Sequence, residues 1–248
     1  MIKEEKKIFI LGNGPSLRGF DFKSLSGHSS IGMNAAYRYW EKINWYPTYY
    51  ICLDAVVIKS HSKAIKNLIN NTSVNGIRKF FLRKEILENE PDLATNEQII
   101  FLEDVTDDSS GIFDCIHITT GSFAARFSIY LGYNQLILLG IDEKYKNFIP
   151  GSKRKENIVL EMTKTPESNE NYFFDDYQRE GDLYQIPNHS TYFKCECRHC
   201  NGEFRDGKLL HIDAWRFLKF DIALDSIKSR FGSIIIINNS PNTLLDIF

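Results

Sequence analysis

Two unbroken apolar runs of strand length constrain the fold of this chain more than any other feature. Residues 135–140 (QLILLG) and 233–238 (SIIIIN) carry aliphatic side chains at successive positions. A strand buries such a run only when both of its faces are covered, as in a parallel sheet flanked by helices. Shorter apolar segments predict five further strands, at 8–11, 29–33, 49–53, 79–82 and 99–102.

Helix-length amphipathic segments lie between these strands, at 35–42, 57–70, 122–131 and 214–231. In the last of them apolar residues recur at spacings of three and four, and Asp213 is placed to cap the helix. Alternating strands and helices are typical of βαβ units. We therefore expect one α/β domain over residues 1–248, with a doubly wound, mostly parallel, Rossmann-like sheet.

The strand and helix pattern lapses between Ile141 and Asp213, where the sequence is mostly polar. A stretch of this length inside a compact domain is usually an active-site lid or a small insertion. We expect such a lid at about 143–212. Within it, Lys153, Arg154 and Lys155 are expected to form a solvated loop.

Charge and composition exclude several classes of protein. The formal net charge is only −2 over 248 residues, so no strong field would attract nucleic acid. The charged residues 1–7 do not form a secretory signal, and no apolar stretch approaches the roughly 18 residues of a membrane span. Five cysteines without an export signal argue against a disulfide framework. We expect a cytoplasmic protein with at most peripheral contact with the inner face of the membrane. The sequence leaves open whether the chain forms a homo-oligomer.

A glycine-containing loop follows the first predicted strand. In the sequence Gly-Asn-Gly-Pro-Ser-Leu, the backbone at Gly12 and Gly14 can turn sharply, and Asn13 and Ser16 can bond a phosphate or a sugar hydroxyl. Ligands of doubly wound sheets bind at the carboxyl ends of the strands, which is where this loop lies. The third glycine of a dinucleotide fingerprint and the Gly-Lys-Ser/Thr of a Walker loop are both absent. A tight turn without a ligand is the alternative.

Polar residues follow other predicted strands at the same edge of the sheet. Asn34, Asp54 and Asp142 each end a strand, and Thr119-Thr120-Gly121 opens the helix before strand 135–140. Each of these residues alone could simply cap a helix or form a turn. Together with the glycine loop they predict a polar binding site for a nucleotide.

These segments, read in order, resemble the bacterial sialyltransferases of glycosyltransferase family 42 and a related group of surface-polysaccharide proteins. The resemblance is carried by the glycine loop, Asn34, Thr119-Thr120-Gly121, Leu131-Gly132-Tyr133 leading to Gly140-Ile141-Asp142, and Pro241-Asn242-Thr243-Leu244-Leu245. It implies a sialyltransferase-like variant of the GT-A fold. The implied activity is inverting transfer of a sugar, such as sialic acid, from a CMP-activated donor to a bacterial surface glycan.

The resemblance also implies roles for individual residues. Asn13, Asn34 and Thr120 would contact the nucleotide, Tyr172 and Tyr177 would neutralise the leaving phosphate, and His189 would be the general base. His117, Asp54 and Asp142 are rival bases. No cofactor would be required, and the sequence lacks the Asp-x-Asp pair that clamps a metal diphosphate.

The sequence also departs from the family pattern. Glu143-Lys144-Tyr145 follows Gly-Ile-Asp where the family has Phe-Tyr, and Leu53-Asp54 replaces the Asn-Pro of its third strand. Asp54 and the segment 171–177 look more like a related domain that includes pterin diphosphokinases. A phosphotransferase of that kind, with Asp107-Asp108 or Asp175-Asp176 holding Mg²⁺, is therefore an alternative. A non-catalytic nucleotide-binding module is another.

A cluster of cysteines is the one motif that these functions leave unexplained. Cys195, Cys197 and Cys200 lie within six residues of one another, and His211, His199 and His189 are near them in the sequence. Three thiolates and a histidine could bind a structural zinc, with His211 as the expected fourth ligand. Free thiols in a loop are the alternative.

Overall fold

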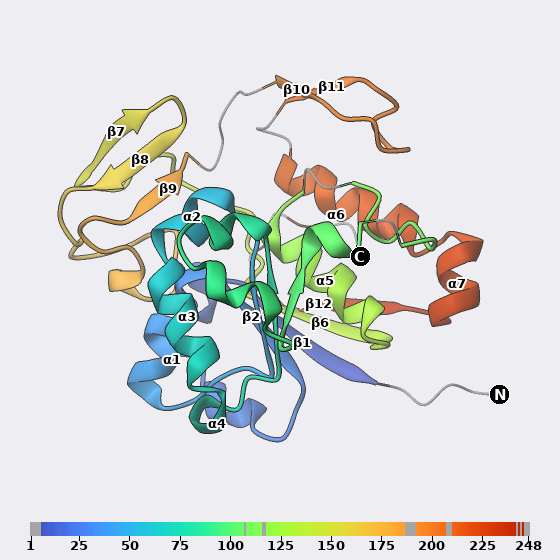
Figure 1. Ribbon diagram of the computed structural model, residues 1–248, viewed down its shortest axis with the longest axis horizontal. Coiled ribbons are helices and arrows are strands. Elements are labelled where there is room, and N and C mark those ends of the chain that lie inside the picture. The colour runs from blue at the N-terminus through green and yellow to red at the C-terminus, as the bar shows by residue number, and fades with distance from the viewer. Residues whose placement is uncertain are drawn as a thin grey trace.

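A seven-stranded sheet forms the centre of the computed structural model, which describes residues 6–106, 108–115, 118–186, 192–206, 210–241, 243 and 245 (Figure 1). All of its neighbouring strands are parallel. In pairing order they are β12 (Ile235–Asn238), β6 (Gln135–Leu139), β1 (Lys7–Leu11), β2 (Ser30–Met33), β3 (Tyr49–Cys52), β4 (Lys79–Leu82) and β5 (Ile99–Phe101). All seven predicted strands are thus confirmed. The expected burial of 233–238 on both faces is wrong, because β12 lies at the edge of the sheet and its Ile235 and Ile237 are exposed.

Helices cover both faces of the sheet, so the sheet is doubly wound as expected. One face carries α1 (Tyr37–Ile43), α2 (Ala55–Ser60), α3 (Ser62–Asn70) and the short α4 (Thr72–Asn75), and the other carries α5 (Thr120–Tyr130), α6 (Leu210–Asp221) and α7 (Asp225–Phe231) (Figure 1). Short 3₁₀ turns lie at Pro15–Leu17, Phe22–Leu25, Asn34–Ala36, Lys84–Glu88, Pro91–Thr95, Leu102–Asp104 and Asp175–Tyr177.

The pleat of the central strands divides the core into two. In β1, Ile8 and Ile10 face the core shared with α5 and α6, whereas Leu11 belongs to the core under α1 and α3. Tyr49 and Tyr50 of β3 divide in the same way. Successive side chains of a strand point to opposite faces, which is why the central strands carry apolar residues at successive positions.

Two of the predicted helices are wrong in detail. Segment 57–70 lies in two helices that meet at His61, and segment 214–231 lies in α6 and α7. Leu224, between α6 and α7, has an extended backbone (φ −69°, ψ 141°), which interrupts the helix. Asp213 is not the cap either, because α6 begins at Leu210 and Asp213 lies in its first turn.

The polar insertion contains strands of its own. The strands β7 (Ser152–Glu156), β8 (Val159–Met162) and β9 (Leu183–Gln185) form a small antiparallel sheet, and β10 (Tyr192–Lys194) and β11 (Phe204–Asp206) form a hairpin. The expected loop at Lys153, Arg154 and Lys155 is wrong, because these residues lie in β7, where pairing with β8 fixes the backbone while the side chains stay exposed. No helix in the described part of the chain has the length and apolar composition of a membrane span.

A buried ion pair holds α5 against α6. Arg126 of α5 is fully buried, and its Nη1 lies 2.5 Å from Oδ2 of Asp221 at the end of α6. The other oxygen of Asp221 accepts hydrogen bonds from Arg198 (2.6 Å) and His199 (2.5 Å). Burial raises the pKa of Asp221, but the bond from His199 and the charge of Arg126 outweigh it and hold that pKa below its usual value.

Replacing Asp221 by Asn should therefore destabilise the protein strongly. The substitution leaves Arg126 buried without a counter-charge, which typically costs about 3–5 kcal/mol in the free energy of unfolding. Asp104→Asn is the matched control, because Asp104 pairs with Lys84 and both side chains are about half exposed; it should cost less than about 1 kcal/mol. Urea denaturation measures both, and equal effects would contradict this assignment.

Candidate active site

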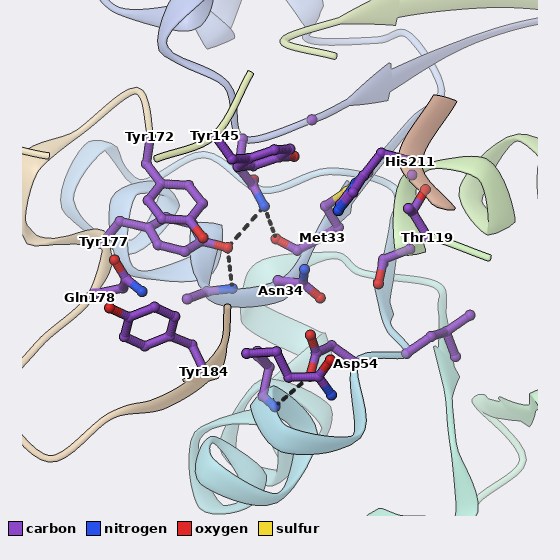
Figure 2. A pocket seen from close by; sticks show the side chains of 18 of the residues that line it. Met33, Asn34, Asp54, Thr119, Tyr145, Tyr172, Tyr177, Gln178, Tyr184 and His211 are labelled. Atoms are coloured by element: carbon purple, nitrogen blue, oxygen red, sulfur yellow. Dashed lines mark hydrogen bonds between the residues drawn. The ribbon is translucent and has the colours of Figure 1, made fainter. Parts of the chain in front are cut away.

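A cavity of about 420 Å³ opens at the carboxyl ends of the central strands (Figure 2). Its floor comes from the loops after β1, β2, β3 and β6 and from the start of α5, and its roof comes from the insertion. The sequence-predicted residues that line it are Gly12, Asn13, Asn34, Asp54, Thr119, Thr120, Gly121, Tyr172, Tyr177 and His211. The structure thus brings together most of the residues that the sequence singled out.

The glycine loop passes against the end of β6. The Gly12 N–H donates to the carbonyl of Leu139 at 2.7 Å, and the Gly14 N–H donates to that of Gly140 at 2.9 Å. A Cβ on Gly12 would stand 2.2 Å from the Gly140 oxygen, so no larger residue fits there.

Gly14 and Ser16 of the glycine loop, and Asp142 after β6, are not among the residues that line the cavity. The buried Asp142 carboxylate accepts hydrogen bonds from the backbone N–H (2.8 Å) and the hydroxyl (2.5 Å) of Ser16. A Cβ on Gly14 would meet the same carboxylate at 2.3 Å. These three residues therefore shape the loop, whereas the sequence predicted that they bind the nucleotide.

Two asparagines that line the cavity have buried side-chain oxygens without a hydrogen-bond partner among the described residues. Asn13 donates from Nδ2 to the hydroxyl of Tyr177 at 2.9 Å, but its buried Oδ1 has no hydrogen bond within the described structure. The same holds for the buried Oδ1 of Asn34, which follows β2 in the left-handed region (φ 53°). Buried polar atoms are rarely left unpaired, so these two oxygens are suited to accept hydrogen bonds from a ligand.

Two stacked tyrosines from the insertion close the cavity above the glycine loop. The rings of Tyr172 and Tyr177 are 3.7 Å apart and nearly parallel, and Figure 2 shows both beside the Asn34 backbone. Burial raises the pKa of each phenol well above its usual value, so both remain neutral hydrogen-bond donors. The Phe173 N–H donates to the Asn13 carbonyl at 3.1 Å, which ties this segment to the loop.

Thr119 and Asp54 both cap helices at the cavity. Thr119 accepts from the Ser122 N–H at 3.3 Å and caps α5, whose first N–H groups therefore face the cavity edge. Asp54 caps α2, because its Oδ1 accepts from the N–H groups of Val56 (2.9 Å) and Val57 (3.0 Å). This accounts for Asp54 without a role as base.

A carboxylate and a histidine meet at the side of the cavity near α5 and α6. Glu143 Oε2 lies 3.4 Å from Nδ1 of His211, and its Oε1 accepts from the Trp215 indole at 3.1 Å. The His211 ring also packs on Tyr145, 5.0 Å away (Figure 2). Burial raises the pKa of Glu143, although the nearby His211 partly offsets this.

Sequence reasoning missed this pair. It placed His211 with the cysteines and noted Glu143 only as a departure from the family pattern. An acidic residue directly after Gly-Ile-Asp was the available signal. The other predicted bases, His189 and His117, lie outside the described residues.

The aspartates that would hold Mg²⁺ in the alternative phosphotransferase form ion pairs with basic side chains, as far as the structure describes them. Asp175 pairs with Arg18, Asp176 with Lys42 and Arg179, and Asp108 with Arg230. None of the three is among the residues that line the cavity. Asp107 lies outside the described residues.

A buried histidine links the cavity wall to the insertion. The ring of His61 bonds the hydroxyl of Tyr37 at 2.8 Å, and its Nε2 lies 3.7 Å from Asp182. Asp182 in turn pairs with both terminal nitrogens of Arg38. Burial lowers the pKa of His61 to about 4, and the charge of Asp182 only partly opposes this shift.

His61 should make the protein less stable in acid. An unfolded histidine gains its proton near pH 6.5, whereas folded His61 gains it only near pH 4, so its contribution is full above pH 6.5 and is lost as the pH falls to about 4. Relative to His61→Gln, which cannot titrate, the wild type should lose roughly 2 kcal/mol in the free energy of unfolding between pH 7 and 4.5. Parallel pH dependences of the two proteins would refute this.

No protein-family model and no curated protein sequence matches this chain. Solved structures do. The sialyltransferase CstII from Campylobacter jejuni in complex with cytidine-5'-monophosphate is 18% identical, with a TM-score of 0.51 over 97% of this chain and 82% of that one. CstII with CMP and a trisaccharide acceptor is 17% identical, with a TM-score of 0.50 over 97% and 83% of the two chains.

The monofunctional α-2,3-sialyltransferase Cst-I from the same organism is 17% identical, with a TM-score of 0.51 over 99% of this chain and 79% of that one. This chain has the sialyltransferase fold. The resemblance inferred from the glycine loop and the strand-end motifs is thereby confirmed at the level of the fold.

Proposed function

We propose that this protein is a glycosyltransferase that transfers a sialic acid-like sugar from a CMP-activated donor to a glycan acceptor. The observation that carries this proposal is the pair of unpartnered amide oxygens, Asn13 Oδ1 and Asn34 Oδ1, at the strand-end cavity. The structures that share this fold include CstII complexes with CMP and with a trisaccharide acceptor, which supports the same ligand classes here.

Each part of the donor finds suitable groups in the cavity. The asparagine oxygens can accept from the hydroxyls of a ribose or the amino group of a cytosine. The N–H groups at the start of α5 and the neutral tyrosine hydroxyls can donate to a phosphate that becomes more negative as the sugar leaves. Such donors can stabilise a leaving phosphate without a metal ion, so the proposed mechanism includes no cofactor.

The Glu143–His211 pair is suited to general base catalysis. Glu143 Oε2 is buried without a hydrogen bond in the described structure and lies 3.4 Å from His211 Nδ1. A small rotation of the His211 ring would let Nδ1 donate its proton to that oxygen, which leaves Nε2 as the nitrogen that accepts a proton. In the proposed step, Nε2 takes the proton of the acceptor hydroxyl, and the acceptor oxygen forms a bond to the anomeric carbon. The bond from that carbon to the phosphate oxygen breaks, and its electron pair leaves with CMP, so attack opposite the leaving group inverts the anomeric centre.

The acceptor and location follow from the same proposal. A bacterial surface glycan assembled at the inner face of the membrane would bring its acceptor to a cytoplasmic enzyme of this kind. The phosphotransferase and the non-catalytic binding module remain as outcomes that the experiments below distinguish.

CMP should stabilise the fold, and ATP with Mg²⁺ should not. At a hundred times its dissociation constant, CMP should add about 2.7 kcal/mol, or roughly 5–10 °C in Tm for a chain of this size. Asn13→Ala and Asn34→Gly should weaken binding about 10-fold or more, because each removes an amide that a ligand would use. Glycine suits the left-handed backbone at position 34.

The control is Asn67→Ala, which removes an exposed amide on α3 away from the cavity and should leave the CMP shift unchanged. Thermal-shift titrations with CMP, UDP, GDP and ATP measure all four proteins. A shift with ATP and Mg²⁺ alone would overturn the proposal in favour of a phosphotransferase.

His211→Ala should lower kcat by about 10²–10⁴-fold while the affinity for CMP changes little, because the base acts only in the chemical step. The acidic limb of the pH–rate profile should disappear with it. Glu143→Gln should lower kcat by a smaller factor, since it disturbs the base without removing it.

The same assay on His189→Ala decides between the two histidines. If His189→Ala loses the acidic limb while His211→Ala keeps near-wild-type kcat, the assignment to His211 is wrong and the base is the one that the family resemblance implies. If both variants bind CMP and the wild type shows no transfer with any CMP-sugar, the protein is a binding module.

A further inference from the structure

The cysteine cluster occupies the tip of the β10–β11 hairpin. The hairpin loop turns back through Asn201 and Gly202, both with positive φ (47° and 78°). The Gly202 N–H donates to the Cys195 carbonyl at 2.9 Å, and the Asn201 N–H donates to that of Cys197 at 2.8 Å. The loop is therefore a compact knuckle, and Cys195, Cys197 and Cys200 are all buried.

A fourth thiol comes from a distant part of the chain. Cys115 precedes α5, and its Sγ lies 3.8 Å from that of Cys195, 80 residues away. The sulfur atoms of Cys115, Cys195 and Cys197 all lie within 4.8 Å of one another. Cys200 lies outside that group of three, but it belongs to the same hairpin loop, where its N–H donates to the Cys197 carbonyl at 3.1 Å. The four cysteines come from only two segments, and the sulfur atoms of three of them form one compact group.

His211 does not join the thiols. The structure places it in the cavity beside Glu143, and no group of three metal-binding side chains among the described residues includes it. His199 is engaged as well, because it bonds Asp221 and stacks on Phe217. The expected histidine ligand is therefore replaced by Cys115, because α6 carries His211 toward the cavity.

The spacing of the sulfur atoms matches a tetrahedral zinc site. A Zn–S bond of about 2.3 Å places two sulfur ligands of a tetrahedron about 3.8 Å apart. The 3.8 Å between Cys115 and Cys195 agrees with that value and is far longer than the ~2.05 Å of a disulfide. All four cysteines are also free thiols in this structure.

We propose that Cys115, Cys195, Cys197 and Cys200 bind one structural zinc ion. Four protein ligands leave no open coordination position, so this ion would not activate water or bind substrate. The inference rests on the thiols and does not depend on the proposed transferase activity.

The zinc would fasten the insertion to the wall of the cavity. Cys115 lies four residues before Thr119, the cap of α5. Arg198, between the cysteines, also bonds this segment, with its N–H on Asp114 (2.8 Å) and its guanidinium on the Gly111 carbonyl (3.0 Å). The metal would therefore hold the start of α5 in place from outside the cavity.

Metal analysis of protein purified without chelator should give about one zinc per chain. Replacing the zinc with Co²⁺ should produce the thiolate charge-transfer and tetrahedral d–d bands of a four-sulfur site. Cys115→Ala should weaken zinc binding by at least about 100-fold in competition with a chromogenic chelator, since it removes a direct ligand. A strong chelator should lower the Tm of the wild type, because zinc binds the folded state.

Cys52→Ala is the matched control, because Cys52 is equally buried but lies in β3 and belongs to no thiol group. It should keep one zinc at wild-type affinity. Cys115→Ala with undiminished affinity would overturn the four-thiol site. The four-thiol site would also be overturned if the wild-type protein took up no zinc, contained iron in its place, or formed a disulfide among these cysteines. These wild-type measurements do not require the Cys115 variant to fold.

Discussion

The close approach of the glycine loop to the end of β6 is the constraint on which the rest of the site depends. At this point the chain changes from building the sheet on one side of β1 to building it on the other, so two loops must leave the same place in the sheet. Gly12 has room only for a hydrogen beside the Gly140 carbonyl. Gly140 itself adopts φ 68°, which suits glycine.

Polar side chains lie on both sides of the point where the glycine loop meets the end of β6. On the outer side, Asp142 holds Ser16 and so fixes the direction of the loop. On the inner side, Asn13 is held between Tyr177 and the Met33 carbonyl, with its Oδ1 left for a ligand. One constraint of the sheet thus gives the loop its shape and the cavity its floor.

The roof of the cavity is anchored by buried contacts. Phe173 packs against Phe22 and Tyr39, and Asp182 pairs with Arg38 where both side chains are largely buried. The segment that carries the two stacked tyrosines is therefore fixed to the α1 side of the sheet. On the α5 side, the bonds from Arg198 and His199 to Asp221 hold the hairpin loop. The two sides of the cavity have separate supports, which lets each be tested without disturbing the other.

The sequence by itself determined the sheet, the glycine loop and most of the cavity floor. An unbroken apolar run predicts a strand, and residues that directly follow parallel strands must meet at one edge, so local sequence sufficed for these features. It did not predict that β12 lies at the edge of the sheet, where Ile235 and Ile237 are exposed. Only the tertiary structure paired Glu143 with His211 and Cys115 with the hairpin thiols, and only it showed Asp142 bonded to Ser16. These outcomes depend on how α6 and the insertion pack on α5. Such packing joins segments that are far apart in the sequence, and no local pattern records it.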